Sequence, residues 1–265
     1  MSPNVATVAA IGVAAYAVTD LVYLGFQGAA CVYEGCELVE IASSAVRKVP
    51  PNFPGFEPLL VHTGGALGNL TVFLLGWALT SRNSDWSTPM KYFLWLTMTL
   101  NGLVAGGQIL ISNAFDAGDW AMLTHNWPYR ILWKLLFTAI GFGIALFAFT
   151  ISREGIEIFL GRKLEHRRAL LPILGGVPYL AGGLFITATA ALSVNNKLES
   201  IAVAAIWTFG LTAWLLIFAR MPDLPRPRTP HRPLVVGRSP SWIAAAAILA
   251  VAFAAVLGPG IWLYS

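Results

Sequence analysis

Charged residues are scarce in this chain: Asp, Glu, Lys and Arg together make up 11% of its 265 residues. Apolar residues make up 57% of the chain, which is more than one soluble core of this size needs. This composition excludes an ordinary soluble protein and a disordered one. The sequence therefore predicts an all-α, polytopic integral membrane protein, folded as a single transmembrane domain over residues 1–265.

Several signatures of common chemistries are also absent. The sequence has no phosphate-binding Gly-rich loop, no Cys-x-x-Cys pair and no nucleophile elbow. It has no paired intramembrane His of the kind that holds haem, and its last apolar run contains no Lys for a retinal Schiff base. The net charge of +4 does not indicate a nucleic-acid partner, because the basic residues lie between apolar runs and act as topology signals.

Apolar runs of about 20 residues can cross the hydrocarbon core as helices, since a helix satisfies its own backbone hydrogen bonds there. The sequence contains about seven such runs, at roughly 5–27, 58–80, 91–112, 130–151, 169–193, 200–220 and 241–264. The first lacks the basic leader and cleavage site of a signal peptide, so we expect it to remain as a helix.

Seven spans sort the 17 Lys and Arg residues into unequal groups, because the two termini then lie on opposite sides. Twelve fall on the side of the N-terminus: Arg82, Lys91, Arg153, Arg162, Lys163, Arg167, Arg168, Arg220, Arg226, Arg228, Arg232 and Arg238. Five fall on the other side: Arg47, Lys48, Arg130, Lys134 and Lys197. The positive-inside rule therefore predicts a cytoplasmic N-terminus and an outer C-terminus.

Two loops have distinctive compositions. The predicted outer loop 28–57 carries the only cysteines, Cys31 and Cys36, which are either thiols in a buried loop or the ends of a small disulfide ring. The same loop carries Glu34, Glu37 and Glu40 at a spacing that suggests one solvated acidic helix face. The predicted cytoplasmic loop 221–240 is rich in Pro and Arg, which predicts a stiff basic linker suited to acidic membrane lipids or to a partner's surface.

Polar residues gather around the end of the third run and the start of the fourth. Candidate catalytic residues are His62, Asp116, Asp119 and His125, and a divalent metal held by His62, Asp116 and Asp119 is the candidate cofactor. Candidate substrate-binding residues are Gln27, Asn69, Asn113, Trp120 and Arg130. Asp20 is the one carboxylate well inside a predicted span, where it is either a hydrogen-bonded neutral acid or a functional group.

Alternation of helix direction predicts that this cluster forms one pocket. The end of the first span, the start of the second, the end of the third and the start of the fourth then share one face of the membrane. The pairs Gly64/Gly68 and Gly102/Gly106 are expected to bring the second and third helices close together. The alternative is local: Asp116 and Asp119 end or cap helices, and Arg130 forms an ion pair.

The stretch Gly64-Gly65-Ala66-Leu67-Gly68-Asn69 resembles the Gly-Gly-x-x-x-Asn element of site-2 protease-like intramembrane metallopeptidases. The stretch from Asn113 to Asp119 is similar to their Asn-x-x-Pro-x-x-x-x-Asp-Gly element, with Asp116 in place of Pro and Trp120 in place of Gly. In that family a preceding His-Glu-x-x-His helix supplies two zinc ligands and a general base, and the later Asp completes the site.

The residues that occupy the His-Glu-x-x-His place here are Tyr23-Leu24-Gly25-Phe26-Gln27, with neither His nor Glu among them. The resemblance therefore implies a relative of the fold without its protease activity. We expect a non-proteolytic relative or accessory subunit that binds a membrane-protein partner, a lipid or a small lipophilic ligand at the outer face. One alternative is an intramembrane enzyme acting on a lipid or isoprenoid, or a divergent metallohydrolase. A transporter is the second alternative.

Overall fold

The computed structural model describes residues 2–49, 59–80, 85–160, 164–194, 197–220 and 233–263. Within these ranges seven helices are long and apolar enough to cross a membrane. They cover Val5–Tyr33, Leu59–Thr80, Thr88–Phe115, Arg130–Phe159, Leu164–Ala190, Lys197–Ile217 and Pro240–Leu257. The predicted all-α class is therefore confirmed, and each predicted run overlaps one of these helices.

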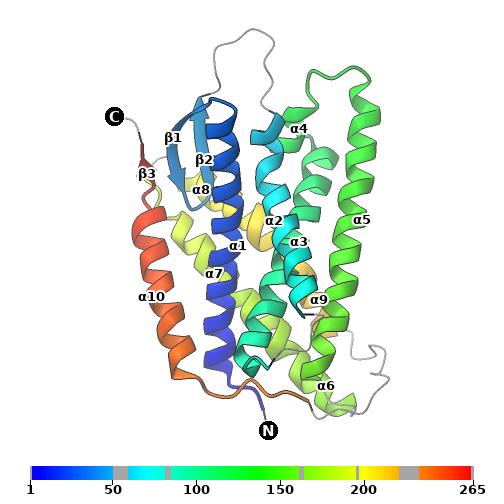
Figure 1. The fold of residues 1–265 in the computed structure, drawn as a ribbon, viewed down its shortest axis with the longest axis vertical. Helices are drawn as coiled ribbons and strands as arrows, with labels where there is room; N and C mark the ends of the chain where they lie inside the picture. The colour runs from blue at the N-terminus through cyan, green and yellow to red at the C-terminus, as the bar shows by residue number, and fades with distance from the viewer. Residues whose placement is uncertain are drawn as a thin grey trace.

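The first four helices that cross the bundle are continuous, and a short helix lies between the third and fourth. The four are α1 (Val5–Tyr33), α2 (Leu59–Thr80), α3 (Thr88–Phe115) and α5 (Arg130–Ile156), and the short helix between α3 and α5 is α4 (Asp119–Leu123). Figure 1 shows that they run up and down the long axis, with α4 at the end opposite the N-terminus. The lengths of the apolar runs account for this arrangement, since each is sufficient to span the hydrocarbon core.

The fifth and sixth spans are interrupted by short turns of other helix types. The fifth consists of α6 (Leu164–Leu171), the π-helical η2 (Pro172–Gly176) and α7 (Val177–Ala190). The sixth consists of α8 (Lys197–Val203), the π-helical η3 (Ala204–Gly210), η4 (Leu211–Ala213) and α9 (Trp214–Arg220). The seventh is α10 (Pro240–Leu257). π-helical turns cost regular hydrogen bonding and occur often at functional sites.

The first helix is longer than its apolar run predicts. Asn4 caps it by accepting a hydrogen bond from the backbone N of Thr7 at 3.0 Å, and the helix continues to Tyr33, beyond the predicted end at residue 27. The residues that follow Gln27 are small and compatible with a helix, so nothing in them stops it. The predicted start of the outer loop at residue 28 is therefore wrong, because the helix continues to Tyr33.

A small sheet replaces much of the predicted outer loop. Strand β1 (Glu37–Ala42) pairs antiparallel with β2 (Ala45–Val49) and with β3 (Ile261–Trp262), in the order β2-β1-β3. The seventh run was predicted to reach residue 264, but its helix ends at Leu257 and β3 follows. Figure 1 shows the sheet beside the upper part of α1, at the same end as α4 and α8, which we call the sheet end.

The core is centred on α3, which is buried along most of its length, whereas α5 and α10 are exposed on one side. Polar side chains tie α3 to its neighbours inside the apolar core. Tyr92 Oη donates to the carbonyl of Leu174 at 2.6 Å, and Trp95 Nε1 donates to the carbonyl of Ser152 at 2.8 Å. Such bonds satisfy polar groups that have no water to bind at this depth.

The second and third helices pack together as predicted, but most of the four predicted glycines face other helices. Gly64 and Gly68 of α2 lie against Phe26 of α1, and Gly106 of α3 lies against Ala145 of α5. Of these four glycines, only Gly102 of α3 contacts the predicted partner helix, where it lies against Phe73 of α2. The spacing Gly-x-x-x-Gly predicts that a helix has a close neighbour without saying which one.

Two predicted features lie partly outside the described residues. The Pro-rich end of the outer loop falls in 50–58, and most of the basic linker 221–240 falls in 221–232. After it, the backbone N of Leu234 donates to the carbonyl of Ile158, and the carbonyl of Val236 accepts from the N of Asn4.

Candidate functional site: a polar cavity at the sheet end

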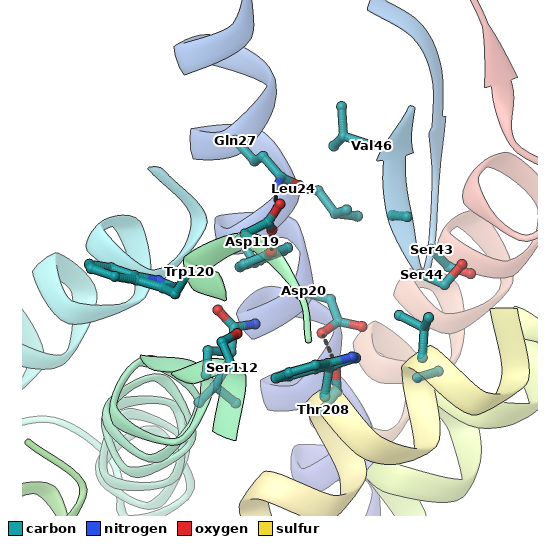
Figure 2. A pocket seen from close by; sticks show the side chains of 18 of the residues that line it. Asp20, Leu24, Gln27, Ser43, Ser44, Val46, Ser112, Asp119, Trp120 and Thr208 are labelled. Carbon is teal, nitrogen blue, oxygen red and sulfur yellow. Dashed lines mark hydrogen bonds between the residues drawn. The ribbon is translucent and has the colours of Figure 1, made fainter. Parts of the chain in front are cut away.

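A cavity of about 350 Å³ lies within the sheet end of the bundle. Figure 2 shows its walls: α1 with Asp20 and Gln27, the turn between β1 and β2, the end of α3, the start of α4, and the π-helical η3 with Thr208. Its volume is at the lower end of the range for small-molecule sites. Residues from α1, the β1–β2 hairpin, α3, α4, α8 and η3 therefore enclose one space.

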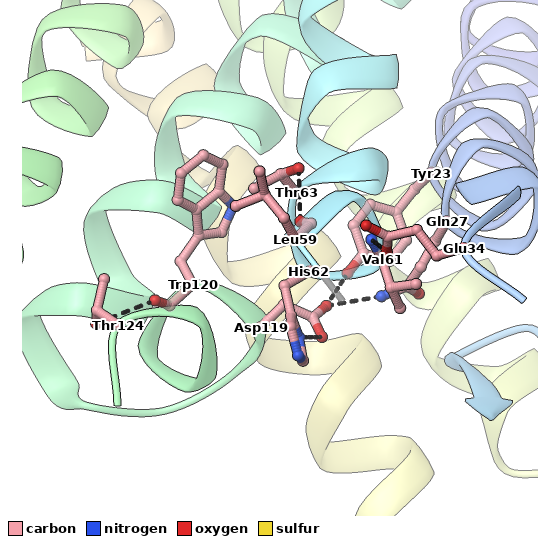
Figure 3. A network of polar contacts seen from close by, with 10 residues as sticks. All are labelled: Tyr23, Gln27, Glu34, Leu59, Val61, His62, Thr63, Asp119, Trp120 and Thr124. Carbon is pink, nitrogen blue, oxygen red and sulfur yellow. Dashed lines mark hydrogen bonds and ion pairs between the residues drawn. The ribbon is translucent and has the colours of Figure 1, made fainter. Parts of the chain in front are cut away.

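Asp119 is the centre of a hydrogen-bond network beside this cavity (Figure 3). Its Oδ2 accepts from Tyr23 Oη at 2.7 Å and from Gln27 Nε2 at 2.8 Å, both from α1. Its Oδ1 lies 3.4 Å from Nδ1 of His62, at the start of α2. The structure thus brings together Gln27, His62 and Asp119 of the predicted pocket.

The backbone around Asp119 explains how this carboxylate reaches α1. The third helix ends at Asp116 in a left-handed conformation with φ of 57°, and Gly118 follows with φ of 84°. These two residues reverse the chain, and Asp119 then opens α4. A positive φ is costly for residues other than Gly, but Asp is among the residues that tolerate it best.

Asp116 does not join Asp119, because that chain reversal separates two residues that a continuous helix would place on one face. It pairs instead with Arg130 Nη2 at 2.5 Å and Lys134 Nζ at 3.4 Å. Desolvation acts to raise the pKa of Asp116, but these two positive charges outweigh it and hold the pKa below its usual value. Asp116 therefore ends a helix and forms an ion pair with Arg130, as the local alternative predicts.

The other predicted residues lie apart from the network. His125 is exposed in the turn after α4. Asn113 is buried and donates to the carbonyl of its own helix at Ile109, at 2.8 Å. Trp120 packs edge-on against Phe137, with ring centroids 5.2 Å apart. Asn69 is fully buried, and within the described part of the chain neither its amide N nor its amide O has a hydrogen-bond partner.

The proposed metal ligands do not converge. Of His62, Asp116 and Asp119, only His62 and Asp119 are adjacent. Across the described ranges, no three His, Cys, Asp or Glu side chains are grouped closely enough to hold a metal ion. Tyr23 and Gln27 also present a hydroxyl and an amide N–H to Oδ2 of Asp119, where a zinc site of this kind would have imidazole or carboxylate ligands.

Two residues of this region were missed or misread in the sequence. The resemblance makes Tyr23 only a replaced zinc ligand, yet its hydroxyl donates to Asp119 at 2.7 Å. The spacing of the glutamates predicts that Glu34 belongs to a solvated acidic face, but its two carboxylate oxygens accept from the backbone N of Leu60 and Val61, each at 2.9 Å. It thereby caps α2 and fixes the helix that carries His62.

The predicted acidic helix face is also wrong at Glu40, because this segment is a strand and not a helix. Glu40 is 1% exposed and lies 3.4 Å from the guanidinium of Arg47 on β2. Cys31 and Cys36 are both buried thiols, and the backbone N of Cys36 donates to the carbonyl of Cys31 at 2.9 Å. Their disulfide stays a prediction for an oxidising environment.

The chain matches no known family, no curated protein and no solved structure.

Proposed function

We propose that this chain is a non-proteolytic membrane protein that binds a small lipophilic ligand at the sheet end, in the cavity beside Asp119. The observation that carries the proposal is the network of Tyr23, Gln27 and Asp119 at the wall of that cavity. These are the three positions at which the resemblance to site-2 protease-like proteins puts the zinc ligands. Their convergence supports the relationship in fold, and their chemistry supports loss of the protease reaction.

Hydrogen bonding at Asp119 favours binding over metal-dependent hydrolysis. A zinc site needs ligands with free lone pairs, such as imidazole or carboxylate, and a water activated by the metal. Tyr23 and Gln27 instead donate hydrogen bonds to Oδ2 of the carboxylate. The hydrogen bonds then hold the side chains of Tyr23, Gln27 and Asp119 in fixed positions at the wall of the cavity.

Metal analysis tests the non-proteolytic part of this proposal. Protein purified in detergent and exchanged into zinc-containing buffer is expected to retain far less than stoichiometric zinc. Asp119→Asn is expected to leave that content unchanged, because the carboxylate is not a ligand. Stoichiometric zinc that is lost in Asp119→Asn or Gln27→Ala would contradict the proposal. Mass spectrometry of molecules that copurify with the same sample tests the binding part.

The contact between His62 and Asp119 favours a second candidate, an intramembrane enzyme acting on a lipid. An imidazole beside a carboxylate is the arrangement that general acid–base catalysis uses. Incubation with membrane lipids would then yield a product that His62→Ala abolishes. A turnover-free lipid complex that survives His62→Ala supports the binding function instead.

We further propose that the sheet end faces outward and the N-terminus lies in the cytoplasm. The unequal division of Lys and Arg, twelve against five, supports this orientation. A reporter fused at Arg162 is expected to be active only in the cytoplasm, and one fused at Lys197 only after export. Reporters that place both positions on the same side would contradict the seven-span order as well as the orientation.

A further inference from the structure

The cavity at the sheet end is acidic. Three of its lining residues carry carboxylates: Asp20 from α1, Asp119 from α4 and Glu199 from α8. No Lys, Arg or His is among the described residues that line it. Because the surroundings have a low dielectric constant, this excess of negative groups attracts a cation much more strongly than it would in water.

Asp20 marks where a ligand's charged group would bind. The side chain is 6% exposed, and it points into the cavity from α1 in Figure 2. Its Oδ1 accepts from Thr208 Oγ1 at 3.1 Å, whereas its Oδ2 has no hydrogen-bond partner among the described residues. A buried carboxylate oxygen without a donor is unfavourable, so a bound group that donates to it is strongly stabilised.

The lining suits an organic cation better than a metal ion. The three carboxylates are spread over three helices, and no metal-sized cluster of His, Cys, Asp or Glu occurs in the described ranges. Aromatic side chains fill part of the remaining wall: Tyr23, Trp120 and Trp207. Aromatic faces attract ammonium groups and also pack against an apolar body.

The π-helical turn η3 contributes directly to this wall. It carries both Thr208, the partner of Asp20, and Trp207, and the carbonyls of a π-turn are shifted from regular helical register. The residues nearest the surface are Gly118, Met122 and Glu199, which are exposed, so one carboxylate lies at the entrance and another at the buried end.

We propose that this cavity binds an organic ammonium ion with an apolar body, and that Asp20 is its counter-ion. The inference rests on the proposed ligand-binding function and adds the chemical class of the ligand. The ammonium group donates to Asp20 Oδ2, the aromatic side chains contact the apolar body, and Glu199 attracts the cation at the entrance.

Three probes of nearly equal shape test the charge requirement: 2-phenylethylamine, which is cationic, 2-phenylethanol, which is neutral, and 3-phenylpropionate, which is anionic. Binding to the detergent-solubilised full chain is measured by calorimetry and by the change in intrinsic tryptophan fluorescence. The amine is expected to bind roughly tenfold or more tightly than the alcohol, and the acid not at all.

Two variants separate the counter-ion from the fold. Asp20→Asn keeps an oxygen for Thr208 and is expected to weaken amine binding by roughly tenfold or more without changing alcohol binding. Glu199→Gln, at an exposed position, is expected to weaken amine binding by a smaller factor and to leave the fold intact. Asp85→Asn, an exposed acidic residue outside the cavity lining, is the matched control and is expected to bind like the unchanged chain.

Each outcome distinguishes this inference from the proposed function. Equal binding of the amine and the alcohol overturns the ammonium inference but leaves a lipophilic site. The same holds if an uncharged lipid copurifies and no amine displaces it. Amine binding that is unchanged in Asp20→Asn also overturns it, whatever Glu199→Gln does. Stoichiometric zinc with peptide cleavage overturns the proposed function itself.

Discussion

Replacing Gly141 by alanine is expected to destabilise the helical bundle by about 2–3 kcal/mol, which is the upper range for overpacking a tight core. An added Cβ at Gly141 would overlap the backbone N of Leu110 and lie 2.8 Å from the carbonyl O of Gly106. Both are main-chain atoms of α3, so no side chain can rotate away. The helices α3 and α5 would have to separate along their whole contact.

Gly143 provides a matched control two residues further along the same helix. It is exposed, and an added Cβ there would meet no described atom within 4 Å. Gly143→Ala is therefore expected to leave the melting temperature unchanged or to raise it slightly, since alanine favours a helix over glycine. Thermal unfolding of both variants in the same detergent provides the measurement. Equal effects of the two substitutions would contradict the packing of α3 on α5.

The sequence predicts the long apolar helices well because their signal is physical and local. A run of apolar residues long enough to cross hydrocarbon can be satisfied there only by a helix, so seven runs yield seven helices. The ends are less predictable. Apolar β3 was counted as part of the last span because Ile261 and Trp262 are apolar, and its pairing with β1 joins residues more than 200 positions apart.

The candidate site was predictable to the extent that it follows from helix direction. Alternating spans place the end of α1, the start of α2 and the end of α3 at the same end, and the structure joins Gln27, His62 and Asp119 there. The separation of Asp116 from Asp119 was not predictable from spacing, because the positive φ angles of Asp116 and Gly118 redirect the chain. The cavity depends on how η3 and the hairpin pack, and no local pattern in the sequence specifies that contact.

Removal of the Asp119 carboxylate is expected to have the largest effect at the sheet end. Asp119→Ala leaves the Tyr23 hydroxyl and the buried Gln27 amide without their acceptor. An unsatisfied buried donor costs about 1–3 kcal/mol, and Tyr23 is only partly buried, so we expect a total loss of roughly 2–4 kcal/mol in the free energy of unfolding. Asp119→Asn should cost less, because an amide oxygen can still accept one or both bonds. Thermal unfolding of the purified variants measures the series.

Asp116→Ala is the matched control, three residues earlier. Its carboxylate is exposed and pairs with Arg130 and Lys134, so water can replace those contacts and the expected change in melting temperature is small. Tyr23→Phe combined with Asp119→Ala extends the test, because the hydroxyl that Asp119→Ala leaves unsatisfied is then absent. The double variant is expected to be less destabilised than the two single effects add up to. Strict additivity, or an Asp116→Ala effect as large as that of Asp119→Ala, would contradict a network centred on Asp119. Non-additivity would identify the bond between α1 and α4 as the contact that holds this wall of the cavity in place.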